Sequence, residues 1–131
     1  MHDGTAKLYE IGGKATPGLE KLAEGGAPEL LLEEISKLDG VSAAGIVGTA
    51  ALAEGQAFPE FGVTFGSDAR YFNVVSALSP ANDAFFSLVP VGIEIVDAGG
   101  TPIGDRLSPD MVLADAGTET GQGGAIGPDM I

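Results

Sequence analysis

The chain has 131 residues, of which 44% are apolar, which is enough for the core of one domain and argues against intrinsic disorder. Nineteen acidic residues oppose six basic ones, and a net charge of −13 disfavours nucleic acid and anionic lipid as partners but attracts divalent cations. The lack of cysteine excludes disulfides and thiolate metal sites, and no apolar run approaches the roughly 20 residues that would cross a bilayer.

The N-terminal part predicts a short strand and two small helices. Residues Lys7–Ile11 have the composition of a strand. Thr16 is placed to cap a helix that begins at Pro17 and is stopped by glycines at 25 and 26. A second helix is expected from Pro28 to about Leu38, because Leu31, Ile35 and Leu38 recur on one face.

The rest of the chain, after Gly40, predicts short strands separated by turns rich in Gly, Pro, Asn and Asp. The expected strands are Ala43–Val47, Gly62–Phe65, Arg70–Leu78, Gly92–Asp97 and Met111–Ala114. The last residues, 120–131, are Gly-rich and are expected to form a loop or a tail. These elements predict a single, mainly β domain over residues 1–131, with two short helices near the N-terminus.

Two acidic segments each follow an apolar strand, and each could supply calcium ligands. The first is residues 79–85 and contains Asn82 and Asp83, and the second is residues 114–121 and contains Asp115 and Glu119. Calcium takes six to eight oxygen ligands from carboxylates, amides and carbonyls. Asn and Asp are also favoured in ordinary turns, so the residue types alone leave open the reading that both segments are merely turns.

Three blocks of sequence resemble the spondin N-terminal domain family. Residues 2–26 contain the run Leu-Tyr-Glu-Ile-Gly-Gly followed by Leu-Glu-Lys-Leu-Ala-Glu-Gly-Gly, similar to the family's opening strand and helix. Residues 74–88 (VVSALSPANDAFFSL) resemble its apolar strand, Pro turn and Asn-Asp motif. Residues 115–119 (DAGTE) match its third motif. The blocks occur in the family's order and together cover most of the chain.

The resemblance implies a C2-like antiparallel β-sandwich in a secreted or extracellular protein that binds Ca²⁺ through loop carboxylates. Carried over to this chain, it identifies Asp83, Asp115 and Glu119 as metal ligands, with Asn82 as a further candidate. No signal peptide is recognisable in the N-terminal residues. The implied role is non-enzymatic, through contact with an extracellular protein, a glycan or another copy of the chain, without membrane insertion.

The sequence also departs from the family's pattern. A strand expected upstream of the His-Asp segment and another near the C-terminus are not recognisable. A missing strand would leave an unpaired sheet edge, so a strand from another chain could complete the domain and give an oligomer or filament. A self-assembling structural subunit is therefore the alternative function.

A hydrolase that uses the same carboxylates is a second alternative. The chain has no Trp that could stack on a sugar, and none of its Ser residues lies in a G-x-S-x-G motif. His2 is the single histidine, and it is expected to be an ordinary strand-entry or surface residue rather than a ligand. Sequence analysis thus favours a calcium-binding module over an enzyme.

Overall fold

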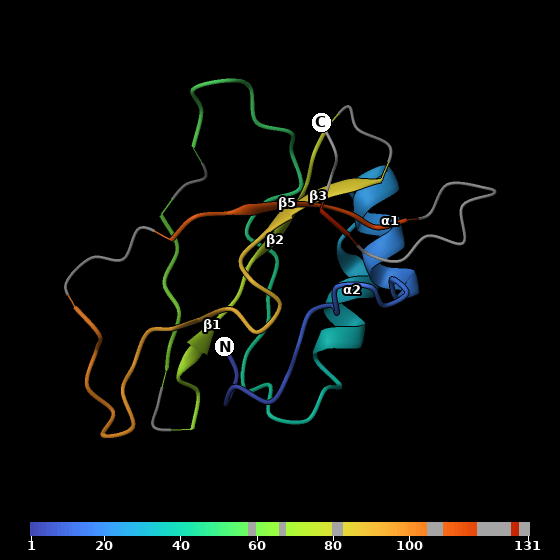
Figure 1. Ribbon diagram of the computed structural model, residues 1–131. Helices are drawn as coiled ribbons and strands as arrows, with labels where there is room; N and C mark the ends of the chain where they lie inside the picture. The colour runs from blue at the N-terminus through green and yellow to red at the C-terminus, as the bar shows by residue number, and fades with distance from the viewer. Residues whose placement is uncertain (58–59, 66–67, 80–82, 105–108, 118–126, 129–131) are drawn as a thin grey trace.

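The computed structural model describes residues 1–57, 60–65, 68–79, 83–104, 109–117 and 127–128 (Figure 1). In these residues two helices accompany two antiparallel sheets, so the observed fold is mixed α/β. The elements are α1 (Pro17–Gly25), α2 (Glu29–Ile35), β1 (Tyr71–Phe72), β2 (Val75–Ala77), β3 (Ala84–Ser87), β4 (Ile93–Glu94), β5 (Val112–Asp115) and β6 (Gly127–Pro128). No helix among the described residues is long and apolar enough to span a bilayer.

Helix α1 forms where the sequence predicts it. The side chain of Thr16 accepts a hydrogen bond from the Leu19 amide at 3.2 Å, and Pro17 occupies the first helical position, where its missing N–H costs nothing. Gly26 ends the helix in the left-handed conformation (φ 66°), and its amide bonds the Leu22 carbonyl at 2.8 Å. The predicted start and stop signals of this helix are confirmed.

Helix α2 packs against α1 and is shorter than predicted, because turns replace the helix after Ile35. The carboxylate of Glu34 reaches back to the start of α1. It accepts hydrogen bonds from the Gly18 amide at 2.9 Å and from the Thr16 hydroxyl at 2.6 Å. One acidic side chain of α2 therefore satisfies donors at the N-terminus of α1, where a negative charge also complements the helix dipole.

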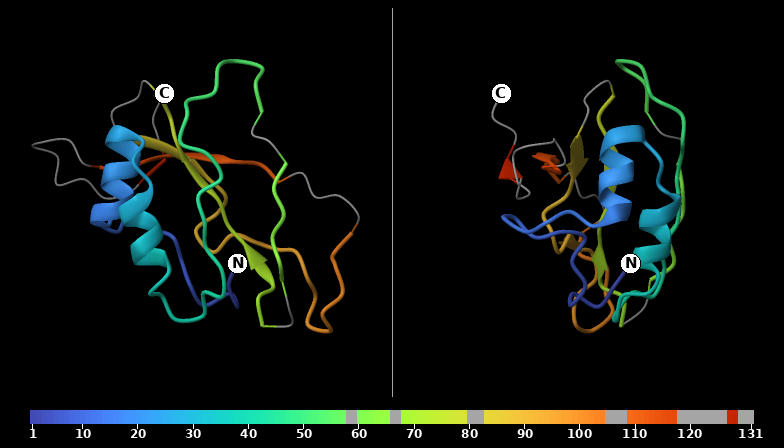
Figure 2. Two further views of the ribbon diagram at one scale, coloured as in Figure 1. Left: turned by 180° about the vertical axis from the view of Figure 1, so that it is seen from behind. Right: turned by 90° about the vertical axis from the view of Figure 1, so that its right-hand side faces the viewer.

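The larger sheet has the order β2-β3-β5-β6, and all its neighbouring strands are antiparallel. The smaller sheet pairs β1 with β4. In the larger sheet, side chains of one face pack on the helices, which lie to one side of the strands in Figure 2. The core there joins Leu19 and Leu22 of α1, Leu31 of α2 and Phe85 and Ala114 of the sheet.

The buried side chain of Tyr9 connects the N-terminal segment to β3 through hydrogen bonds and ring packing. The Tyr9 hydroxyl lies 2.6 Å from the Ser87 hydroxyl and donates to the Leu88 carbonyl at 3.1 Å, and its ring meets Phe85 edge-on. Residues 7–11 hold this position without joining a strand ladder, so the strand predicted there is not formed.

The strand predictions succeed in part. The predicted strand at residues 70–78 is divided into β1 and β2 at Asn73, whose side chain accepts from the next amide at 2.8 Å and donates to two carbonyls of the chain at 89–90. β4 lies inside the predicted Gly92–Asp97, and β5 is shifted by one residue from the prediction. β6 lies in the segment expected to be a loop or tail.

Besides the strand at residues 7–11, two further predicted strands are wrong, and β3, like β6, is an observed strand that was not predicted. Residues 43–47 and 60–65 are described as extended chain without ladder partners. β3 was missed because the turn residues just before it dominate the local pattern, although it contributes the fully buried Phe85.

Candidate calcium site and apolar groove

The pairing of β3 with β5 brings the two acidic segments together. Ala84 is the cross-strand partner of Asp115, and the Ala116 amide donates to the Asp83 carbonyl at 2.8 Å. Two aspartates that are 32 positions apart in the chain therefore occupy adjoining positions at one end of the larger sheet. Both are half-buried.

The ladder also constrains where an ion could bind. Residues that occupy successive ladder positions point to opposite faces of a sheet. Asp115 shares a ladder position with Ala84, whereas the carbonyl of Asp83 belongs to the next position along. The backbones of Asp83 and Asp115 thus meet at the last ladder pair, and an ion that both carboxylates bind would lie near this end of the sheet.

Asp115 also has a local structural role. Its Oδ1 atom accepts a hydrogen bond from the Gly117 amide at 2.5 Å, which closes the turn after β5, and Gly117 adopts a positive φ of 66°. This is the Asx turn that the alternative reading of the segment expects. A carboxylate oxygen has more than one lone pair, so the turn and a metal contact are compatible.

The other two predicted ligands, Asn82 and Glu119, lie outside the residues that the structure describes. Among the described residues, no group of three or more Asp, Glu, His or Cys side chains is placed to hold a metal ion. The structure thus brings together the backbone positions of two of the four predicted ligands, and the full calcium site remains a prediction.

His2 is not a surface residue. Its side chain is buried, it stacks on Tyr71 with ring centroids 5.7 Å apart, and its Nδ1 atom accepts from the Gly4 amide at 3.1 Å. Its backbone forms isolated β-bridges with Tyr71 and Val41. Burial lowers the pKa of His2 below its ordinary value, and the nearby N-terminal ammonium lowers it further. The expected strand-entry role fits these bridges.

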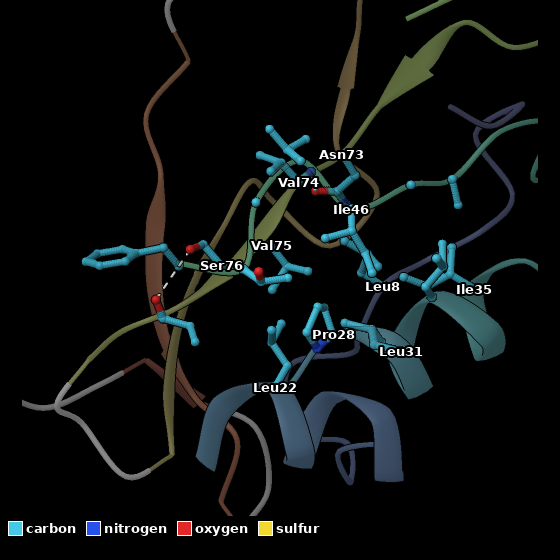
Figure 3. Close-up of a pocket in the computed structure, with 18 of the residues that line it drawn as sticks. Leu8, Leu22, Pro28, Leu31, Ile35, Ile46, Asn73, Val74, Val75 and Ser76 are labelled. Atoms are coloured by element: carbon cyan, nitrogen blue, oxygen red, sulfur yellow. Dashed lines mark hydrogen bonds between the residues drawn. The ribbon is translucent and has the colours of Figure 1, made fainter. Parts of the chain in front are cut away.

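A large apolar groove, which the sequence did not indicate, lies between the helices, β2 and the extended segments 43–52 and 60–64. Its cavity volume of ≈ 1240 Å³ exceeds the 300–1,000 Å³ or so of a typical small-molecule site. In Figure 3, Leu22 and Leu31 of the helices point toward Val75 of β2, with Ile46 of the first extended segment nearby. The groove has several apolar walls that come from distant parts of the chain.

Comparison with protein-family models, with curated proteins and with solved structures found no match.

Proposed function

We propose that this protein is a secreted, non-enzymatic, calcium-binding interaction module of the spondin type, with a C2-like β-sandwich fold. The ion would be held at the end of the larger sheet by Asp83, Asp115 and Glu119, with Asn82 and loop carbonyls completing the shell. The observation that carries the proposal is the β3–β5 register, which brings Asp83 beside Asp115. The two segments involved are those whose motifs resemble the family.

The net charge of the chain also favours calcium as the bound ion. At −13, the protein concentrates divalent cations near its surface, and the three proposed carboxylates would leave only a modest negative excess over Ca²⁺. Calcium bound there would stabilise the folded state by mass action, because an unfolded chain does not hold the ligands together. The expected affinity is that of extracellular calcium modules, about 10⁻⁴–10⁻³ M.

The proposal is tested by isothermal titration of the protein with CaCl₂ into the millimolar range. Asp115→Asn is the informative variant, because the amide oxygen can still accept from Gly117 while the carboxylate charge is lost. Asp97→Asn is its matched control, since the Asp97 carboxylate closes another turn by accepting from Gly99 and Thr101 at 2.8 and 2.9 Å. One saturable site that is lost in Asp115→Asn and kept in Asp97→Asn supports the proposal. Equal weakening in both variants would mean diffuse attraction to an acidic surface and would refute it.

A further inference from the structure

The two extended segments beside the groove are strand-like chain, and no strand in the described part of the chain pairs with them. Residues 44–52 and 60–65 make no backbone hydrogen bond to any other part of the described chain. They nevertheless carry large apolar side chains, and Ile46, Leu52, Phe61 and Val63 are 40–51% exposed. Phe61, Val63 and Phe65 alternate with smaller residues, which is the pattern of a half-buried strand. Figures 1 and 2 show the segments as two long stretches of extended chain that run in nearly opposite directions.

Strand β2 forms a third wall of the groove, and it too has backbone without a described strand partner. β2 is the terminal strand of its sheet among the described residues, because β3 pairs with one of its edges and no described strand pairs with the other. Residues 73–79, which include β2, line the groove. Within the described residues, a strand edge and two extended segments that lack backbone partners thus border one apolar space, and a row of free backbone donors and acceptors is a template for an added strand.

We propose that the groove binds an extended segment of a partner protein in which apolar residues alternate with basic ones, and that this segment adds as a β-strand along the free edge of β2. The unpaired backbone selects a polypeptide over a lipid or a small apolar ligand. The apolar walls select alternate apolar side chains, such as those that would face Val75 and the exposed Ile46 and Val63. This inference rests on the interaction role proposed above but does not require the calcium site.

The negative net charge of the chain favours basic side chains at the partner positions that do not face the apolar walls. A second copy would bring a further −13 to the same surface, whereas a basic segment meets a complementary field. The described groove lining contains both charges, Glu24 and Glu60 as well as Lys7, so the preference for a basic partner comes from the net charge of the whole chain. The occupant is therefore a basic segment of another protein and not a second copy.

The probes are synthetic peptides of about ten residues, the upper range of strand length. One alternates valine with lysine, a second alternates valine with glutamate, and a third is the valine–lysine peptide with N-methyl groups on alternate amides, which cannot donate to a strand edge. Binding is measured by fluorescence anisotropy with excess chelator, so a failure here leaves the calcium titration to stand or fall on its own. We expect saturable binding of the first peptide and at least about tenfold weaker binding of the other two, a loss of about 1.4 kcal/mol each.

Two matched variants locate the binding. Val63→Lys places a positive charge in the groove wall at a side chain that is 43% exposed, so the fold is retained while the basic peptide is repelled. Val89→Lys makes the same change at a side chain that is 51% exposed and outside this groove. We expect Val63→Lys to weaken the valine–lysine peptide about tenfold or more and Val89→Lys to leave it unchanged.

Three results would overturn the proposal. Equal binding of the N-methylated peptide would show that the groove takes apolar groups without strand pairing. An equal effect of the two lysine variants would place the peptide elsewhere on the acidic surface. A dimer in light scattering that excludes the valine–lysine peptide and is lost in Val63→Lys would show that the groove is filled by a second copy.

Discussion

Replacing Gly18 by alanine should destabilise the protein, although alanine is the better helix former. Gly18 lies in the first turn of α1 where α2 crosses it. A Cβ atom at this position would stand 2.6 Å from both the Cα atom and the amide nitrogen of Leu31, where ordinary contact begins at 3.4 Å. The backbones of the two helices would have to move apart by roughly 0.8 Å at this point.

The magnitude follows from three terms. Overpacking of a well-packed contact costs about 1–3 kcal/mol. The displaced helix would also weaken the hydrogen bond from the Gly18 amide to Glu34, which contributes about 1 kcal/mol. The higher helix propensity of alanine returns at most about 1 kcal/mol. The free energy of unfolding should therefore fall by about 1–3 kcal/mol.

Gly25→Ala is the control for this prediction. Gly25 belongs to the same helix, but a Cβ atom there would meet nothing within 4 Å. This variant should be as stable as the parent or gain up to about 1 kcal/mol. Urea denaturation followed by circular dichroism measures both changes. If Gly18→Ala matched or exceeded Gly25→Ala in stability, the close crossing of α1 and α2 would be refuted.

Two further predictions concern buried polar groups near the N-terminus. Tyr9→Phe should lower the free energy of unfolding by about 1 kcal/mol and not more, because Ser87 still donates to the Leu88 carbonyl at 2.6 Å. A thermal melt that shows no loss of stability would contradict this. The pKa of His2 is lowered from its unfolded value of 6.5, so the folded state favours the neutral form. The free energy of unfolding should therefore be at its full value above pH 6.5 and should decline as the pH falls through the folded-state pKa. His2→Asn should flatten the pH dependence of the free energy of unfolding just below pH 6.5, and an unchanged slope would assign that dependence to other groups.

Local sequence signals predicted the helices well. Thr16, Pro17 and Gly26 satisfy the ends of α1 through contacts within a few residues, so their effect is visible in the sequence. The strands were harder, because a strand exists only when a distant segment pairs with it. Residues 43–47 and 62–65 have strand composition but lack a described partner, whereas β3 follows strong turn signals and is stabilised by β2 and β5 on its two sides.

In the candidate site, too, the residue types were visible in the sequence but the pairing of distant segments was not. Residue types suggested Asp83 and Asp115 as ligands, but their proximity depends on the β3–β5 register, a pairing between residues about 30 positions apart. The groove could not be foreseen, since its walls join the helices, β2 and two extended segments that are separated in the chain. The burial of His2 was likewise hidden, because its bridges run to Val41 and Tyr71.

A residue-resolved NMR titration can show whether calcium binds at the end of the larger sheet. Amide resonances are followed while CaCl₂ is added to the millimolar range. We expect saturable shifts with one common affinity at Asp83, Ala84 and residues 115–117, and little change at the Asp97 turn. Shifts that spread over all acidic residues without saturation, or no shift at the β3–β5 end, would contradict it.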